Sequence, residues 1–139
     1  MASYVKYFPF VEHLGNELID IFGITDTFKA AIAAAAYVPA QTHDDLSSVT
    51  QITGTGYNAG GEDIQNDATR ASGTVTMTAL DVVWTAGAAD WGSGQEIVCH
   101  DDTSVTDKLM CYWDYGSTFT VGNGETFTVD FGASLATLA

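Results

Sequence analysis

Residues 108–131 constrain the fold more than any other part of the chain. The segment alternates β-branched and aromatic residues with polar ones, and it carries turn signals at residues 114–116 and at Asn123-Gly124. An Asn-Gly pair between two alternating segments is a strong signal for a two-residue β-hairpin. We therefore predict three consecutive antiparallel strands, over residues 108–113, 117–121 and 125–131.

A second clear strand signal lies at residues 74–79, where Val75, Met77 and Ala79 alternate with threonines. Alternation of this kind indicates a half-buried strand. Further strands are expected at residues 48–53, 80–85 and 95–100, the last pairing with residues 108–113 across the polar turn 101–107. The glycine-rich residues 54–61 predict a flexible loop.

The alanine-rich residues 27–38 fit both a helix and a strand. Alanine favours a helix intrinsically. The flanking Thr27-Phe28 and Tyr37-Val38 pairs and the alternation of Phe28, Ala30 and Ile32 favour a strand, and we predict a strand that Pro39 ends.

One helix is expected near the N-terminus. Four apolar residues recur at helical spacing, namely Phe10, Leu14, Leu18 and Ile21. Pro9 suits the first turn of this helix and Gly23 suits its C-cap. The predicted fold class is all-β, an antiparallel β-sandwich or jelly-roll-like domain with one short N-terminal helix, spanning residues 10–139 as a single domain.

The aromatic residues before this helix form a separate prediction. Tyr4, Tyr7 and Phe8 fall within residues 1–9, which we interpret as an N-terminal arm. Buried aromatic side chains carry much of the binding energy of protein interfaces. The three are candidate contacts to a capsid or to a neighbouring subunit, and packing back onto the domain is the equal alternative.

The charge balance excludes several functions. Eighteen acidic residues face only four basic ones, and the formal net charge is −14. The basic residues are Lys6, Lys29, Arg70 and Lys108. Nucleic-acid binding requires clustered cations, and anionic membranes repel an acidic surface, so we expect neither partner. An acidic surface does suit a basic protein surface.

The start of the chain and the apolar segments indicate where it resides. Residues 1–15 lack a basic segment followed by a long apolar core, and residues 30–40 are too short an apolar run to span a bilayer. We expect the chain to stay in the cytoplasm of its host until it joins an assembly.

The two cysteines, Cys99 and Cys111, lie in strands predicted to be neighbours. A disulfide between them is possible on this placement. A pair of buried thiols is the simpler interpretation, because free cysteine packs as a small hydrophobic residue. Neither has a Cys-x-x-Cys partner, which argues against a structural zinc site.

The most reactive-looking cluster is His100-Asp101-Asp102. Adjacent carboxylates are the oxygen ligands that calcium and other hard cations prefer. The acidic spacing and central glycine of an EF-hand are missing, however, so a solvated turn is favoured. His43-Asp44-Asp45 repeats the pattern in another loop, and the sequence does not place the two loops together. We therefore expect no metal and no cofactor.

The sequence contains no motif that indicates a catalytic site. No serine sits in a Gly-x-Ser-x-Gly elbow, and no pair among the many carboxylates is singled out as catalytic. Several aromatic residues could instead form a sugar-binding platform, namely Trp84, Trp91, Trp113, Tyr112 and Tyr115. Packing in the core and across strands is favoured, because exposed aromatic side chains are the exception. The chain is predicted to be non-enzymatic.

The motif YWDYGSTFTVGNGETFTVDF at residues 112–131 resembles the C-terminal end of small structural proteins of tailed bacteriophages. Residues 10–15 (FVEHLG) and 27–32 (TFKAAI) are similar to earlier segments of such proteins. The resemblance covers most of the chain sparsely and the last third more densely, and it brings no catalytic motif. It implies a structural component of the virion.

Within the virion, a compact acidic β-domain favours a capsid decoration (cement) protein. Its expected partners are the major capsid protein and copies of itself, in a dimer or trimer on the capsid surface. The alternatives are a tail or head–tail connector protein and a carbohydrate-binding β-sandwich on the virion surface.

Overall fold

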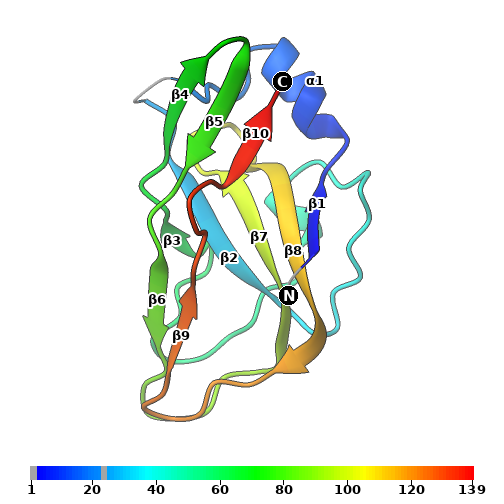
Figure 1. Ribbon diagram of the computed structural model, residues 1–139. Helices are drawn as coiled ribbons and strands as arrows, with labels where there is room; N and C mark the ends of the chain where they lie inside the picture. The colour runs from blue at the N-terminus through cyan, green and yellow to red at the C-terminus, as the bar shows by residue number, and fades with distance from the viewer. Residues whose placement is uncertain (1–2, 23–24) are drawn as a thin grey trace.

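The computed structural model describes residues 3–22 and 25–139, which form ten strands, one α-helix and one short 3₁₀-helix (Figure 1). The elements in chain order are β1 (Ser3–Lys6), α1 (Pro9–Gly15), β2 (Phe28–Ala34), η1 (Leu46–Ser48), β3 (Glu62–Asp63), β4 (Asp67–Ala71), β5 (Thr74–Thr78), β6 (Val82–Thr85), β7 (Gly94–Asp101), β8 (Lys108–Phe119), β9 (Thr126–Val129) and β10 (Ala136–Leu138). The prediction of a mostly β protein with one short helix is confirmed. No helix in the described part of the chain is both long and apolar enough to cross a membrane.

The strands form three antiparallel sheets. The largest has the order β1-β8-β7-β2-β3, and two smaller ones have the orders β10-β5-β4 and β6-β9. Figure 1 shows the smaller sheets beside the long β2, β7 and β8 strands. The predicted pairing of residues 95–100 with 108–113 is confirmed as the β7–β8 hairpin.

In the large sheet, β2, β7 and the first half of β8 are buried on both faces. Along β2, Ala30 and Ile32 pack into one hydrophobic cluster, with Met77 and Trp84 of the smaller sheets. Ala31 and Ala33 pack into a second cluster on the opposite face, under the segment that carries Tyr37, Leu46 and Val49. The alanine-rich residues thus form a strand, as predicted, but it ends at Ala34 rather than at Pro39, because the chain turns where the Tyr37 N–H donates to the Ala34 carbonyl at 2.8 Å.

Cys99 and Cys111 lie directly opposite each other in the β7–β8 ladder. Both side chains are buried and both thiols are free, as the simpler interpretation of the sequence predicted. Burial and the neighbouring Cys99 raise the pKa of the Cys111 thiol, which keeps it in its unreactive protonated form.

The C-terminal prediction of three consecutive hairpin strands is wrong in two respects. Residues 114–116 do not turn, because β8 continues through them to Phe119. A turn does form at residues 122–125, where the Glu125 N–H donates to the Gly122 carbonyl at 2.8 Å. It leads into β9, which pairs with β6 rather than with β8. The rings of Phe119 and Phe127 stack 4.4 Å apart, so side-chain packing joins the segments that were expected to pair as strands.

Two shorter predictions also need correction. Helix α1 ends at Gly15, well before Leu18, because glycine weakens a helix and Glu17 takes a left-handed backbone conformation with φ 56°. The expected cap at Gly23 lies outside the described residues. The predicted strand at 48–53 is reduced to one isolated bridge between Gln51 and Ala33.

The N-terminal residues form part of the domain. Strand β1 pairs with β8 over four registered residues, from Ser3 opposite Asp114 to Lys6 opposite Cys111. Tyr7 follows the strand and is fully buried, with its hydroxyl 3.1 Å from that of Tyr37. Residues 3–7 therefore supply an edge strand and a core anchor, which agrees with the alternative that these residues pack back onto the domain.

The adjacent aromatic residues Tyr7 and Phe8 test this placement. Tyr7 is 0% exposed and Phe8 is 59% exposed. Substitution Tyr7→Ala should lower the free energy of unfolding by about 3–5 kcal/mol, because it leaves a cavity in the core. The matched change Phe8→Ala should alter it by no more than about 0.5 kcal/mol. Urea unfolding followed by tryptophan fluorescence measures both, and equal effects would contradict the assignment.

Candidate functional site

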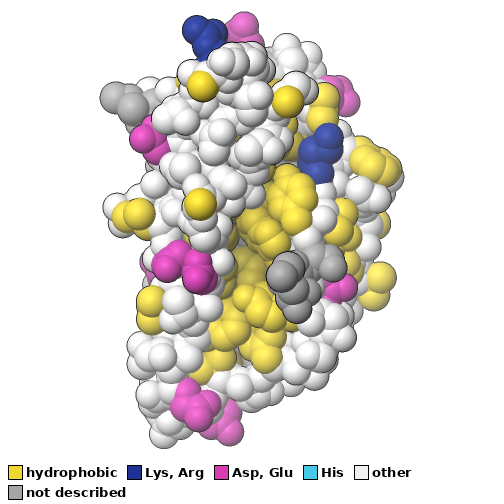
Figure 2. Space-filling view, viewed as in Figure 1, with side chains coloured by type: hydrophobic (Ala, Val, Ile, Leu, Met, Phe, Trp, Pro, Cys, Tyr) yellow, Lys and Arg dark blue, Asp and Glu magenta, His cyan; other side chains and the backbone are white. Residues whose placement is uncertain are grey.

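Two groups of side chains stand out as functional candidates. The first is an aromatic seam, formed by Tyr4, Trp113, Tyr115, Phe119, Phe127 and Phe131. Its rings contact one another in two groups, Tyr4–Trp113–Phe131 with centroid distances of 5.7 Å and 5.5 Å, and Tyr115–Phe119–Phe127 with distances of 4.4–6.0 Å. Trp113, Phe131 and Tyr115 line the same hollow, which joins the two groups. Figure 2 shows hydrophobic side chains gathered on this face, between the β1–β8 edge and strands β9 and β10.

The seam is open to solvent at several points. Tyr4 is 43% exposed and Tyr115 is 39% exposed. Beside them lies a hollow of about 90 Å³, lined by Ile97, Trp113, Tyr115, Val129, Asp130, Phe131 and Ser134. All the aromatic residues of the seam except Tyr4 lie within residues 112–131.

The predicted contact residues have different positions in the structure. Tyr4 belongs to the seam, Phe8 is exposed beside α1, and Tyr7 is buried in the core. Trp84 and Trp91 are also buried, so neither supplies an exposed platform for a sugar ring. The aromatic residues available for contact on this face are therefore Tyr4 and Tyr115, with Trp113 half-buried between them.

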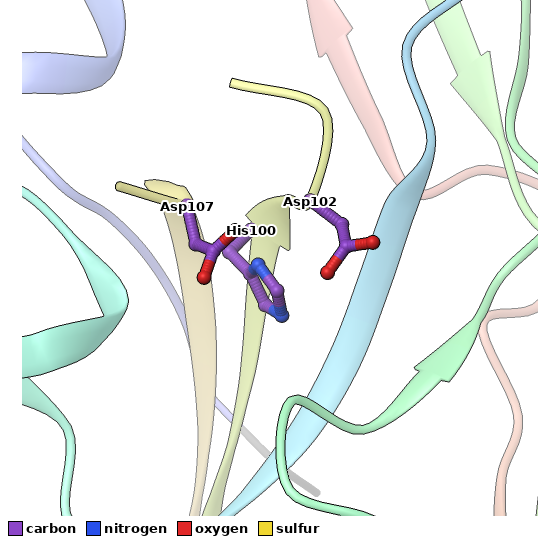
Figure 3. A group of neighbouring side chains, drawn as sticks. All are labelled: His100, Asp102 and Asp107. Carbon is purple, nitrogen blue, oxygen red and sulfur yellow. The ribbon is translucent and has the colours of Figure 1, made fainter. Parts of the chain in front are cut away.

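The second candidate is a histidine–aspartate cluster, formed by His100, Asp102 and Asp107. One potential ligand atom from each residue lies within 4.8 Å of the others. Figure 3 shows the imidazole ring of His100 between the two carboxylates. His100 lies near the end of β7, while Asp102 and Asp107 belong to the turn that leads into β8.

The hydrogen bonding of His100 defines its protonation. Its Nε2 lies 2.8 Å from the Gly60 carbonyl oxygen, which can only accept, so Nε2 carries the proton. The ring is fully buried, and its Nδ1 has no hydrogen-bond partner among the described residues. Burial lowers the pKa of His100, and the nearby Asp107 and Asp102 oppose this change. The neutral ring leaves a lone pair on Nδ1.

The turn that carries the aspartates is organised by Asp101. Its buried carboxylate accepts the N–H of Thr103 at 2.9 Å and of Ser104 at 3.3 Å. Further along, Thr106 and Asp107 both have left-handed backbones, with φ 74° and 54°. Such conformations are uncommon outside glycine, and here they turn the chain back so that Asp107 lies next to His100.

The sequence indicated only part of this cluster. We expected His100, Asp101 and Asp102 to lie together, but successive residues of a strand point to opposite faces. Asp101 therefore turns away, and Asp102 shares the face of His100. Asp107 was missed, although the expected β7–β8 turn returns the chain to the same place. The other His-Asp-Asp sequence contributes no member, because its side chains have different partners.

Those partners are local to the second loop. The Nδ1 of His43 lies 2.8 Å from the Tyr37 hydroxyl, and Asp45 caps η1 through the Ser47 N–H. Asp44 pairs with Lys108 and with the buried His13, and the Lys108 hydrogen bond lowers the pKa of Asp44. The loop is thus bound to the start of β8, beside the cluster but not part of it.

Comparisons of the chain with protein-family models, with curated proteins and with solved structures find no match. Support for a function therefore comes from the residues and their geometry.

The contact between Gly60 and His100 depends on the next residue. A Cβ atom at Gly61 would lie 1.8 Å from the Ala30 carbonyl oxygen, whereas one at Gly60 would meet nothing within 4 Å. Both glycines have positive φ, near 78° and 91°. Gly61→Ala should therefore lower the melting temperature more than Gly60→Ala. Because both substitutions place alanine at a positive φ, the difference between the two melting temperatures, measured by differential scanning calorimetry, reports the clash with the Ala30 carbonyl. Equal losses would show that the close approach is unimportant.

A buried acid gives the protein a distinct pH dependence. Glu96 is 1% exposed, and burial together with Asp114 raises the pKa of its carboxyl from 4.5 to about 7. Tyr37 and Tyr112 also face it. Between these pH values the folded state keeps a proton that the unfolded state loses, so this group favours folding at low pH.

The free energy of unfolding should therefore fall as the pH rises from about 4.5 to about 7, because Glu96 must then ionise inside the fold. Glu96→Gln should remove the contribution of this group to the fall of the unfolding free energy with pH, since the amide does not titrate. Urea unfolding at intervals between pH 4.5 and 8 measures it, with Glu125→Gln on an exposed turn as the control. If the unfolding free energy of Glu96→Gln fell with pH as steeply as that of the unmodified protein, the pH dependence would come from other groups.

Proposed function

We propose that the chain is a non-enzymatic structural protein of a tailed-phage virion, and that it decorates the capsid by binding the major capsid protein. One observation carries the proposal. The segment that resembles phage structural proteins supplies five of the six aromatic residues of the partly exposed seam, and Tyr4 of the predicted contact set supplies the sixth. The seam is the proposed capsid-binding surface.

The charge of the chain supports a protein partner. A formal net charge of −14 suits a basic surface on the capsid and speeds association through long-range attraction. Aromatic residues such as Tyr4 and Tyr115 then supply the short-range contacts, as they do at many protein interfaces. Each contact is modest, and the many equivalent positions of a capsid lattice add to the total affinity through multivalency.

The arrangement of the sheets agrees with this role. We propose that the large sheet and the two smaller ones form a β-sandwich, with the first hydrophobic cluster between them. The exposed edge of β1 is the proposed contact between copies in a dimer or trimer. The longest strand, β8, is paired with β1 and β7, and the described residues contain no long projecting hairpin of the kind that builds a tail tube.

Binding to capsids tests the proposal directly. Capsids assembled from the major capsid protein of the same genome, without this chain, are mixed with the purified protein and separated on a density gradient. We expect saturable co-sedimentation that weakens as salt rises, because the salt screens the acidic surface. The double variant Tyr4→Ser and Tyr115→Ser should bind at least about tenfold more weakly, a loss typical of interface aromatic residues.

A matched control separates the seam from general surface change. The double variant Leu80→Ser and Val83→Ser alters two residues that are each 57% exposed and lie outside the seam. It should bind capsids as the unmodified protein does. Absence of binding by the unmodified protein would contradict decoration, and its assembly into rings or tubes would favour a tail component. Seam-dependent binding to a glycan array would favour the carbohydrate-binding alternative.

A further inference from the structure

We propose that His100, Asp102 and Asp107 form a binding site for a divalent first-row transition ion, with Zn²⁺ as the best-fitting ion. The site lies where the β7–β8 hairpin turns, away from the aromatic seam. This proposal is independent of capsid decoration, because it rests on a different group of residues.

The geometry of the ligands carries the first step. One nitrogen and two carboxylate groups converge, with their ligand atoms within 4.8 Å of one another. Around a tetrahedral zinc ion the ligand atoms lie about 3.3 Å apart, which follows from bonds of about 2.0 Å. Asp102 is exposed and Asp107 is half-buried, so rotation of their side chains closes the remaining distance. Figure 3 shows the carboxylates on either side of the ring.

The second step is the state of His100. A fully buried imidazole normally uses both nitrogens, but its Nδ1 has no hydrogen-bond partner in the described part of the chain. Its Nε2 donates to the Gly60 carbonyl at 2.8 Å. Metal-binding histidines typically hold their other nitrogen in such a bond to a carbonyl or carboxylate, which orients the ring. The ring is thus already in the tautomer that a metal requires.

The donor set selects the class of ion. Calcium and magnesium prefer sites built entirely from oxygen, whereas imidazole nitrogen favours zinc, copper, iron and nickel. Lys29 is 2.8 Å from Oδ2 of Asp102 and leaves the other carboxylate oxygen for an ion. Three protein ligands leave room for at least one water molecule. The ion would hold the turn to the end of β7 and so stabilise the hairpin.

Titration with Zn²⁺ tests the proposal on the purified, metal-free protein. Isothermal titration calorimetry should show one ion bound per chain. The melting temperature should rise by on the order of 5 °C at saturating Zn²⁺, since an ion that binds only the folded state stabilises it. Calcium at the same concentration should leave the melting temperature unchanged, because the nitrogen ligand favours transition ions.

Three variants remove one ligand each. Asp102→Asn and Asp107→Asn preserve the shape of the turn, and His100→Gln keeps a donor toward Gly60 while it removes the Nδ1 lone pair. Each should weaken Zn²⁺ binding at least about tenfold. The control Asp63→Asn replaces an exposed aspartate outside the cluster and should bind as the unmodified protein does.

A spectroscopic measurement on the unmodified protein tests the site even if a variant fails to fold. In ¹⁵N spectra of the unmodified protein, Zn²⁺ should shift the Nδ1 resonance of His100 while Nε2 keeps its proton. Absence of saturable binding, or a Zn²⁺-induced shift that spares His100, would overturn the proposal. So would equal weakening in the Asp63→Asn control, because the ion would then bind the acidic surface at large.

Discussion

The burial of β2, β7 and the first half of β8 on both faces is the constraint on which the rest of the structure depends. One face packs against the smaller sheets, and the other lies under the segment around Tyr37 and Leu46. A strand that is buried on both faces exposes almost no side chain to water, so any polar residue in it must find a partner or lose its charge. Glu96, His100 and Asp101 are the buried polar residues of β7 to which this condition applies.

The degree of burial of each strand explains which sequence predictions were confirmed. Strands with a clear alternation, such as residues 74–78, were located well, because one face meets the core and the other meets solvent. The β7–β8 hairpin was also found, since its turn is polar. The pairing partner of β9 was not predictable from the sequence. The Asn123-Gly124 turn indicates that the chain changes direction, but it does not determine which strand β9 pairs with. Only tertiary packing brings β9 to β6.

The N-terminal residues also show that closeness in the sequence does not determine where side chains lie in the fold. The aromatic residues Tyr4, Tyr7 and Phe8 stand close together in the sequence, yet the structure places them in a solvent-exposed seam, in the core and on the surface. An edge strand changes the side-chain direction at each residue, and the helix that follows changes it again. In the histidine–aspartate cluster, spacing along the strand could indicate Asp102, whereas Asp107 required the return of the chain through a turn.

The two proposed sites lie toward opposite ends of the β7–β8 hairpin. In the β7–β8 ladder, Asp101 pairs with Lys108 next to the cluster, and Gly94 pairs with Phe119 in the seam. Several registered pairs separate these ends, and most of their side chains are buried. An ion at the turn therefore stabilises the hairpin from one end without contacting the surface proposed to bind the capsid. Metal binding should accordingly change the thermal stability of the protein and leave its affinity for capsids unchanged.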